Sequence, residues 1–181
     1  MAASKADDGR GLHALSVALI VLAMLFGFAV LPRLFTPSQG ALVGKDAPDF
    51  TLSLVANGED KAELSMSELK GKPVLLDFWA TWCGPCQAEA PILNKVAQRF
   101  KDRGLVVVGV NTSDQPGRAR PWALSRGITF PIVYDADEVA PMYGVENLPT
   151  LVLVSRTGKV LAVRAGVTSD AELERLVTSA L

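Results

Sequence analysis

Both cysteines of this 181-residue chain lie in one pentapeptide, WCGPC at positions 82–86. It follows a nearly continuous apolar run at 73–79, a pattern typical of a strand covered on both faces. It also opens a segment, 83–101, whose apolar residues recur with helical spacing. A buried strand that passes into a helix through two closely spaced cysteines favours an α/β fold. Such a pair can cycle between dithiol and disulfide, which indicates electron transfer by sulfur chemistry.

The position of Cys83 at the expected start of a helix suits it to nucleophilic attack. Only the thiolate attacks a disulfide, and a free cysteine ionises near pKa ~8.5, too high for much thiolate at neutral pH. Unpaired N–H groups and the helix dipole favour an anion at a helix N-terminus. Gly84 and Pro85 fit the first turn, where proline loses no needed donor. We expect Cys83 to be the nucleophile and Cys86, one turn further on and more buried, to be the resolving thiol.

The rest of the composition restricts the chemistry of this pair. The chain has no third cysteine, and its one histidine, His13, lies beside an apolar segment. A zinc site of the usual kind needs about four ligands, and a Cys–His hydrolase needs a histidine base, so neither is indicated. A static disulfide closing so small a ring is the structural alternative, and it would be a weak staple. We expect no metal and no cofactor.

Two acidic residues lie close to the cysteines in the sequence. Asp77 is inside the apolar strand, where a carboxylate is costly unless it is paired or protonated. It is either a strand-edge residue facing solvent or a buried acid with a raised pKa that takes the proton from Cys86. For Glu89, one turn past Cys86, a solvated helix face is favoured over a catalytic role. Trp82, next to the nucleophile, is expected to be a partly exposed contact surface.

The N-terminal part divides into a short tail at 1–13, an apolar segment at 14–31 without a charge, and a linker at 32–46. The apolar segment is long enough to span a bilayer as a helix, for which about 17–25 residues are needed. A cleaved export signal is the alternative, but its apolar region usually has about 7–15 residues. Pro32 and the residues after it are also a poor cleavage context. We therefore favour an uncleaved transmembrane anchor, followed by one domain at 47–181.

Charge and cysteine usage suggest where this domain works. Lys5 and Arg10 before the apolar segment give a weak bias toward an N-terminus inside the cell. The domain would then face the periplasm or extracytoplasmic side of the cytoplasmic membrane, where disulfide exchange is commonplace. The net charge is −1 and no basic run occurs, so nucleic acid is not an expected partner.

The pattern of residues 47–181 predicts alternating strands and helices. Strands are expected at 49–54, 63–65, 73–79, 105–110, 130–133, 150–154 and 160–164. Helices are expected as a single turn at 67–70 and over 83–101, 116–126, 137–143 and 169–181, the last with Ser169 and Glu172 as a capping box. This order implies a three-layer α/β/α sandwich with a mixed sheet.

Three segments carry a family resemblance that covers about residues 44–181. The segment DFWATWCGPC at 77–86 resembles the active site of thioredoxins. The segments EAP at 89–91 and YGVENLPT at 143–150 are similar to the TlpA/ResA-like branch, the membrane-anchored thiol-disulfide oxidoreductases of the thioredoxin superfamily. This resemblance implies a thioredoxin fold with an N-terminal β extension and a central insertion between Thr112 and Val145.

The resemblance also assigns roles that spacing alone does not. Sequence alone makes Pro149 an ordinary turn residue, because only about 5–6% of X–Pro bonds are cis. The family implies a cis-proline there, beside the disulfide. The residues implied to bind the substrate chain are Trp82, Gly84, Pro85, Leu148 and Pro149.

Other positions match the family or depart from it. Asp77 matches the buried acid of thioredoxins, and Pro91 matches the kink in their active-site helix. Members devoted to cytochrome c maturation often carry an acidic residue where this chain has Gly84. Gln87 and Asn147 also replace residues that are frequent in the family. The combination favours a general reductase over a dedicated apocytochrome c reductase.

Three functions follow from these observations. The first is reduction of disulfides in exported proteins, with electrons from a membrane thiol-transfer protein. The second is a redoxin-type thiol peroxidase, although the chain lacks the Pro-x-x-x-Thr-x-x-Cys setting of such enzymes. The third is a copper-binding chaperone, which would need a histidine that the domain does not have. We favour the first.

Overall fold

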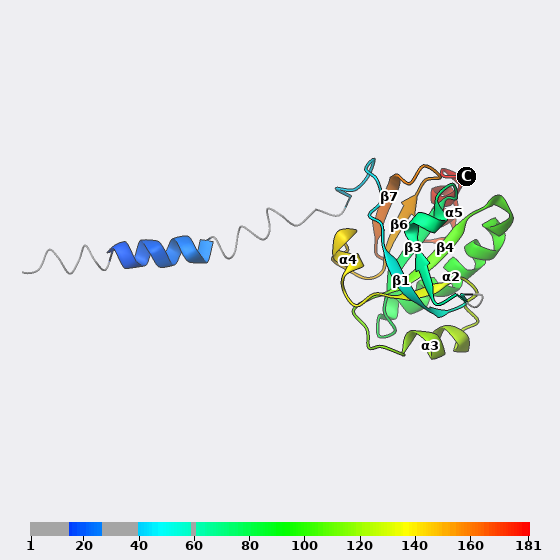
Figure 1. Cartoon of the computed structure of the whole chain (residues 1–181), viewed down its shortest axis with the longest axis horizontal. Helices are drawn as coiled ribbons and strands as arrows, with labels where there is room; N and C mark the ends of the chain where they lie inside the picture. Colours follow the sequence, from blue (N-terminus) through cyan, green and yellow to red (C-terminus); the bar gives the residue numbers. More distant parts are fainter. Residues whose placement is uncertain (1–14, 27–39, 59–60) are drawn as a thin grey trace, which may run out of the picture. The chain divides into compact units, whose positions relative to one another are not determined.

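The computed structural model describes residues 15–26, 40–58 and 61–181, and the chain divides into two units, Met1–Thr36 and Pro37–Leu181 (Figure 1). In the first unit, residues 15–26 form a helix with exposed side chains. The rest of the expected anchor at 14–31, the tail at 1–13 and the first part of the linker lie outside the described residues. Among the described helices, none has the length and apolar character needed to cross a membrane.

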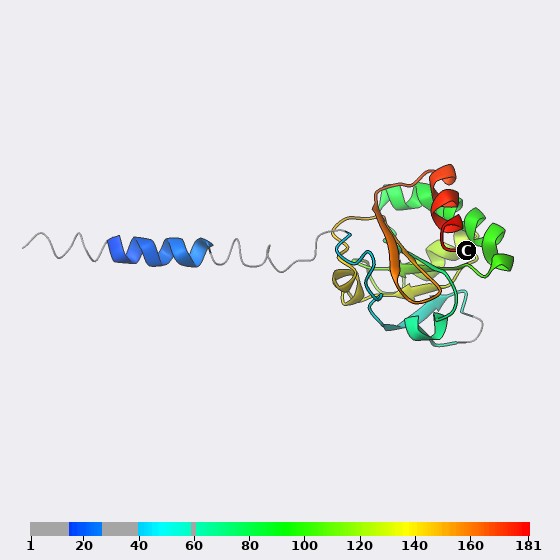
Figure 2. The ribbon, with the colours of Figure 1, turned by 90° about the horizontal axis from the view of Figure 1, so that it is seen from above.

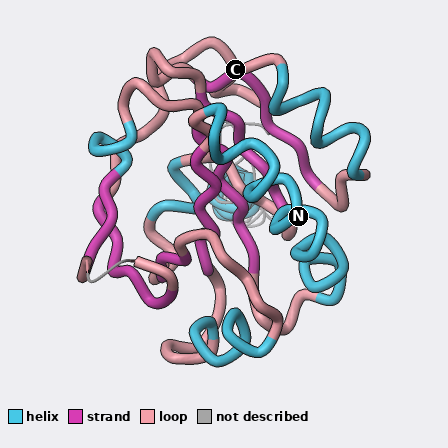
Figure 3. The backbone as a smooth tube through the Cα atoms, turned by 90° about the vertical axis from the view of Figure 1, so that its right-hand side faces the viewer, coloured by secondary structure: helices cyan, strands magenta, loops and turns pink. Residues whose placement is uncertain are grey.

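The second unit is built on a mixed sheet, seen in Figures 1 and 3. Its strand order is β2-β1-β5-β4-β3-β6-β7. The pairs β3–β4 and β4–β5 are parallel, and the other neighbours are antiparallel. The three-stranded parallel centre therefore carries an antiparallel hairpin on each side. The strands are β1 (Thr51–Ala56), β2 (Glu63–Ser65), β3 (Val74–Trp79), β4 (Val106–Asn111), β5 (Ile132–Tyr134), β6 (Thr150–Val154) and β7 (Val160–Ala165).

Helices cover both faces of this sheet, which confirms the predicted three-layer arrangement. Alternate residues of β3 point to opposite faces, so Leu75 and Trp79 join one core cluster while Leu76 and Phe78 join the other. The first cluster lies under α2 (Gly84–Phe100), α3 (Ala119–Ser125) and α5 (Asp170–Thr178). The second is covered by η1 (Met66–Leu69) and α4 (Val139–Met142), and a short turn, η2 (Lys101–Arg103), follows α2.

The helix α5 lies beside α2 on the first face, as Figure 2 shows in red and green. Arg99 of α2 and Glu174 of α5 form an ion pair between them. The predicted cap of α5 is confirmed, because the Ser169 side chain accepts a hydrogen bond from the N–H of Glu172. This packing fixes the active-site helix against the C-terminal end of the chain.

Two helices are shorter than the sequence predicts, and left-handed residues explain both starts. Gly117 has φ +84°, so α3 begins only at Ala119 rather than near residue 116. Asp137 has φ +64°, so α4 begins at Val139 rather than at residue 137. In both cases the chain turns sharply just before the helix. The two loops follow the parallel strands β4 and β5, so both lie at the same end of the sheet.

The last part of the expected linker is bonded to the domain. The N–H groups of Gly44 and Ala47 donate to the carbonyls of Val160 and Gly158, each over 2.8 Å. Val160 N–H donates in turn to Lys45 O over 2.9 Å. The segment 44–47 therefore adds a short stretch of pairing to the outer edge of β7.

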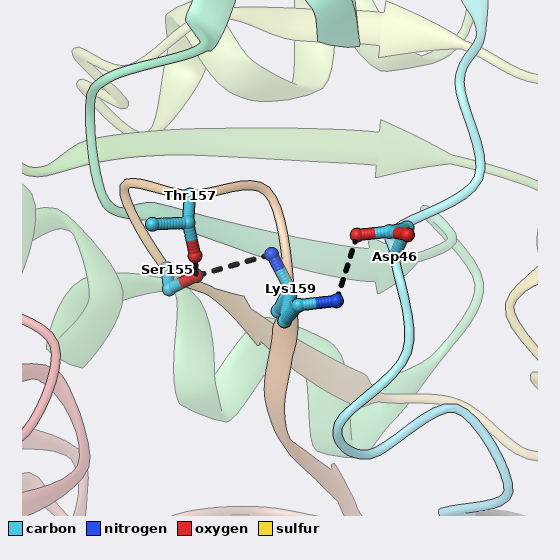
Figure 4. Close-up of polar contacts among 4 residues, drawn as sticks. All are labelled: Asp46, Ser155, Thr157 and Lys159. Carbon is cyan, nitrogen blue, oxygen red and sulfur yellow. Dashed lines mark hydrogen bonds and ion pairs between the residues drawn. The ribbon is translucent and has the colours of Figure 1, made fainter.

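Side chains reinforce this attachment at the β6–β7 turn (Figure 4). Lys159 Nζ lies 3.1 Å from Asp46 Oδ1. The backbone N–H of Lys159 donates to Ser155 Oγ over 3.0 Å. The hydroxyl groups of Ser155 and Thr157 are 2.9 Å apart. The turn is thus held both from within and from the N-terminal segment.

Candidate functional site

The register of the sheet brings four chain segments to one end of the domain. Trp79 at the end of β3 pairs with Asn111 at the end of β4, which pairs with Tyr134 at the end of β5. Phe78 pairs with Thr150, so the start of antiparallel β6 lies at the same end. Loops after parallel strands commonly form binding sites in such folds. The segments at this end of the sheet carry the two cysteines, the left-handed residues Gly117 and Asp137, and the Leu148–Pro149 bond.

The two cysteines form a disulfide at the start of α2, with their Cα atoms 5.3 Å apart. Cys83 is the N-cap residue of α2, and its Sγ accepts a hydrogen bond from the N–H of Cys86 over 3.2 Å. Gly84 and Pro85 form the exposed first turn, as predicted. A sulfur at this position receives an N–H group that no helical carbonyl occupies.

The expectation that Cys86 is more buried than Cys83 is wrong for this oxidised form. Each cysteine exposes only 4% of its surface. The disulfide holds both sulfurs together, and both residues pack in the core cluster that also contains Ala80 and Ala90. The difference between the cysteines is therefore one of hydrogen bonding rather than of burial.

Asp77 is buried, with 5% of its surface exposed, which excludes the solvent-facing alternative. It alternates with Leu76 and Phe78 and so points to the face covered by α2. Its Oδ1 has no hydrogen-bond partner among the described residues. Burial raises the pKa of the Asp77 carboxyl well above its ordinary value, and the nearby Glu89 carboxylate raises this pKa further. A carboxyl in this setting favours the protonated form.

Glu89 corrects the prediction of a solvated helix face. Its side chain is fully buried, and its Oε1 accepts the N–H of Thr168 over 2.7 Å. Its Oε2 has no hydrogen-bond partner in the part of the chain that the structure describes. Burial raises the pKa of Glu89, partly offset by the hydrogen bonds from Thr168. The helical pattern could not reveal this, because the loop before α5 that covers Glu89 comes from far along the chain.

The Leu148–Pro149 peptide bond is cis, as the family resemblance implies. Leu148 is half-buried and packs against the core cluster that contains both cysteines. Pro149 O accepts the N–H of Gly166 over 2.8 Å, and Thr150 Oγ1 donates to Asn147 O over 2.7 Å. These bonds fix the loop before β6 at the disulfide end of the sheet.

The two tryptophans of the active-site segment have opposite environments. Trp79 is buried, and its ring packs 4.5 Å from that of Trp122, centroid to centroid. Trp82 exposes 61% of its surface, more than the partial exposure expected, and its indole N–H donates to Ser113 O over 2.8 Å. Trp82 therefore presents a large apolar ring to solvent directly beside Cys83.

Asp114, which the sequence analysis did not single out, organises the loop before the cysteines. Its carboxylate accepts the Thr81 N–H over 2.6 Å and the Thr81 hydroxyl over 3.0 Å, and Asn111 Nδ2 lies 3.0 Å away. Burial alone would raise the pKa of Asp114, but the hydrogen bonds from Thr81, Asn111 and Gln115 lower it below its ordinary value. A carboxyl just after a strand end was the signal that could have identified it.

Among the described residues, no group of histidine, cysteine, aspartate and glutamate side chains is arranged to hold a metal ion. The described site combines one disulfide, the buried carboxyl groups of Asp77 and Glu89, and the exposed ring of Trp82.

Comparison with known proteins places these features in a family. The model of the AhpC/TSA family matches residues 43–163. This chain belongs to the AhpC/TSA family. It is 34% identical over 162 residues to the thiol-disulfide oxidoreductase ResA of Geobacillus kaustophilus, covering 89% of this chain and 91% of the relative. It is 35% identical over 153 residues to ResA of Bacillus subtilis, covering 84% and 83%.

Solved structures agree with these relatives. A thiol:disulfide interchange protein of the thioredoxin family from Chlorobium tepidum has a TM-score of 0.67 and 29% identity, covering 75% of this chain and 94% of that chain. A secreted disulfide oxidoreductase of Mycobacterium tuberculosis has a TM-score of 0.62 and 28% identity, covering 72% and 95%. The predicted thioredoxin fold and ResA-like resemblance are confirmed. The chain is a thiol-disulfide oxidoreductase.

Proposed function

We propose that this enzyme reduces disulfides of exported proteins, with Cys83 as nucleophile and Cys86 as resolving thiol. The observation that carries the proposal is the N-cap position of Cys83, whose Sγ accepts the N–H of Cys86. In the reduced enzyme the same N–H would stabilise a thiolate at Cys83, because charge-assisted hydrogen bonds favour the ionised form. The ionised sulfur is the one that attacks.

The reaction proceeds by two sulfur exchanges. The Cys83 thiolate attacks one sulfur of the substrate disulfide, which forms a mixed disulfide and releases the other substrate sulfur as a thiolate. Cys86 then loses its proton and attacks Cys83 Sγ. This second exchange closes the Cys83–Cys86 disulfide and frees the remaining substrate thiolate. Two electrons pass from the enzyme dithiol to the substrate, and a membrane thiol-transfer protein is proposed to return them.

Asp77 is proposed to accept the proton of Cys86. It lies in β3 beneath α2, and its buried carboxyl has a raised pKa. A base with a pKa near the working pH is the most effective proton acceptor. The carboxylate that accepts this proton becomes neutral, which removes the cost of a buried charge.

The substrate chain is proposed to dock around the disulfide. Trp82 supplies an exposed ring beside Cys83, and the pairing of Thr150 with Phe78 brings Leu148 and Pro149 to the same end of the sheet. Gly84 and Pro85 leave the first turn of α2 open to a partner, since both are exposed.

We also propose that the domain works outside the cytoplasmic membrane, tethered by the apolar segment 14–31. Support comes from the uncharged sequence of that segment and from the exposed apolar side chains of its residues 15–26. The Mycobacterium tuberculosis neighbour is described as secreted. Alkaline extraction of membranes tests the anchor, because a cleaved export signal would leave the mature protein in the soluble fraction.

Insulin reduction tests the nucleophile. We expect Cys83→Ser to abolish reduction, because the attacking thiolate is removed, whereas the wild-type protein with a dithiol donor should precipitate insulin chains. A matched control is Gln98→Ala, at an exposed position of the helix α2, which retains both cysteines and Trp82. An undiminished rate in Cys83→Ser would refute the assignment.

Trapping tests the substrate class. We expect Cys86→Ala to accumulate mixed disulfides with exported proteins, because the second exchange is blocked. Mass spectrometry after non-reducing gels would identify them. Recovery of apocytochrome c alone would contradict general reduction and support a role confined to cytochrome c maturation.

A thiol-peroxidase activity is the competing function within the same family. The positions three and seven residues before Cys83 hold Ala80 and Leu76, where the peroxidase setting has threonine and proline. Peroxide consumption in the presence of a thiol donor separates the two activities. We expect it to stay at the rate of the uncatalysed control.

A further inference from the structure

The Trp82 indole makes one hydrogen bond with the residues that the structure describes, to the loop after β4. Its indole N–H donates to Ser113 O over 2.8 Å, while 61% of the residue is exposed. An exposed ring with one polar contact can adopt several orientations unless the acceptor of that contact is itself fixed. The orientation of Trp82 beside Cys83 therefore depends on what fixes the Ser113 carbonyl.

Ser113 has an unusual backbone conformation that needs support. Its φ is +51°, in the left-handed region that residues other than glycine seldom occupy. Such conformations cost about 1–3 kcal/mol and persist where the surroundings impose them. The support must therefore come from groups that bond to Ser113 itself.

Asp137 provides that support through one carboxylate oxygen. Its Oδ1 accepts the Ser113 N–H over 2.7 Å, the Ser113 hydroxyl over 2.9 Å and the Thr112 hydroxyl over 3.0 Å. Hydrogen bonds to a charged acceptor are stronger than those between neutral groups. Asp137 thus holds the backbone N–H and the side chain of Ser113. These bonds support the left-handed conformation of Ser113, which sets the direction of its carbonyl.

The sheet explains how a residue so distant in sequence reaches this loop. Ser113 follows β4 and Asp137 follows β5, and the parallel pairing of Asn111 with Tyr134 brings both loops to the disulfide end. Asp137 belongs to the segment between Thr112 and Val145, which the family resemblance implies to be an insertion. Two consecutive hydrogen-bonded contacts therefore connect this segment to Trp82: Asp137 with Ser113, and Ser113 with Trp82.

We propose that Asp137 is a positioning residue for protein substrates: through Ser113 it sets the orientation in which Trp82 meets the chain that flanks the substrate disulfide. This rests on the proposed docking of polypeptide substrates at Trp82. A small aromatic disulfide does not need that contact, because only the sulfur must reach Cys83. Asp137 should therefore affect the binding of protein disulfides without affecting sulfur exchange.

The test compares Asp137→Ala with the wild-type protein on two substrates. We expect KM for insulin to rise about 3- to 10-fold with kcat unchanged, as for the loss of one or two hydrogen bonds. The rate with the small disulfide 5,5′-dithiobis(2-nitrobenzoate) should be unchanged. The indole N–H resonance of Trp82 should shift in the ¹⁵N NMR spectrum. An unchanged KM, or equal losses on both substrates, would overturn the proposal.

The matched control is Glu138→Ala, at the adjacent exposed position, where the side chain makes no hydrogen bond or ion pair with another described residue. It should leave both KM values and the indole resonance unchanged. Asp137→Asn keeps a neutral oxygen acceptor, so its KM should lie between those of the wild type and Asp137→Ala. It also serves as the test variant if Asp137→Ala fails to fold.

A double-mutant cycle identifies the route of the effect. Trp82→Phe replaces the indole with a phenyl ring and so removes the N–H that donates to Ser113 O. Asp137→Ala should therefore add no further rise in KM in that background. Additive effects would show that Asp137 acts elsewhere and would refute the route through Trp82. If the wild-type protein does not reduce insulin, the proposed function fails instead, while the indole shift still reports the link between Asp137 and Trp82.

Discussion

At the residue scale, the carboxyl groups around the disulfide fall into two electrostatic classes. Asp77 and Glu89 are buried, and burial raises the pKa of each. Asp114 is surrounded by donors that lower its pKa against the effect of burial, and hydrogen bonds from Ser113 lower the pKa of Asp137. Burial favours the protonated form of the first pair, whereas hydrogen bonds favour the ionised form of the second pair, which holds loops in place.

Asp77→Asn should stabilise the protein and slow the second exchange. As pH rises above about 4, the unfolded chain loses the Asp77 proton before the folded protein does, so the stability of the wild type falls with pH until the folded carboxyl also ionises. Asparagine does not titrate, so in urea unfolding the gain from Asp77→Asn should grow as pH rises above about 4, up to the pH at which the folded carboxyl ionises. Release of substrate from the mixed disulfide should slow about 10²-fold, as expected for loss of a proton acceptor.

Asp114→Asn should change the pH dependence of stability in the opposite direction. Its lowered pKa stabilises the folded protein above about pH 4, and this contribution is lost as pH falls through the folded pKa. Asp114→Asn should therefore destabilise most at neutral pH. A gain for Asp77→Asn that does not increase with pH would contradict the account of that residue.

At the element scale, Glu89 joins the active-site helix to the loop before α5. Its Oε1 accepts the buried N–H of Thr168, and Ser169 caps α5 one residue later. The same carboxyl raises the pKa of Asp77 in β3. One buried side chain therefore links a strand, the helix that carries the cysteines and the C-terminal helix.

Glu89→Ala should destabilise the protein more than Glu89→Gln. Alanine leaves the Thr168 N–H buried without its acceptor, at a cost of about 1–3 kcal/mol. Glutamine keeps an oxygen there and resembles the protonated acid, so the free energy of unfolding of Glu89→Gln should approach that of the wild type as pH falls. Gln98→Ala, exposed on the same helix, is the control and should change stability by less than about 0.5 kcal/mol. Equal losses for alanine and glutamine would argue against this contact.

At the scale of the whole molecule, the domain has two functionally different ends. The register places the start of β6 beside the end of β3, near the cysteines, and places Val160 at the other end, beside Val154 and Val74. The N-terminal segment 44–47 bonds to that second end. Attachment and catalysis are therefore separated by the length of the central strands.

Ala47→Pro should lower stability without changing catalysis. Proline removes the N–H that donates to Gly158 O, which should cost about 1–3 kcal/mol in thermal or urea unfolding. Asp46→Ala is the control, because its ion pair with Lys159 is exposed and should contribute less than about 1 kcal/mol. Insulin reduction by either variant should match the wild type. A change in KM would show that the two ends are coupled.

The sequence predicted well the features that depend on local pattern. The buried strand before the cysteines, the N-cap position of Cys83 and the cap of α5 all follow from periodicity and residue type. The cis bond before Pro149 was reached only through family resemblance, because turn chemistry alone favours trans.

Features that depend on the sheet order could not be predicted. Glu89 looked solvated because the residue that covers it, Thr168, lies 79 positions away. Asp114 and Asp137 were missed as supports of the active-site loop because only parallel pairing of β3, β4 and β5 brings their loops together. The pairing of segment 44–47 with the β6–β7 turn could not be predicted either, since the glycine and proline content of the expected linker at 32–46 is typical of a tether.

The place of that pairing has a mechanical consequence. A pull on the chain before Gly44 acts first on its backbone bonds to Val160 and Gly158 and on the turn between β6 and β7. None of these bonds involves β3 or α2. Tension would therefore peel the outer edge of the sheet one bond at a time at the end remote from Cys83. The strand and helix that hold the disulfide would keep their geometry under load, and a pulled molecule would remain a working enzyme.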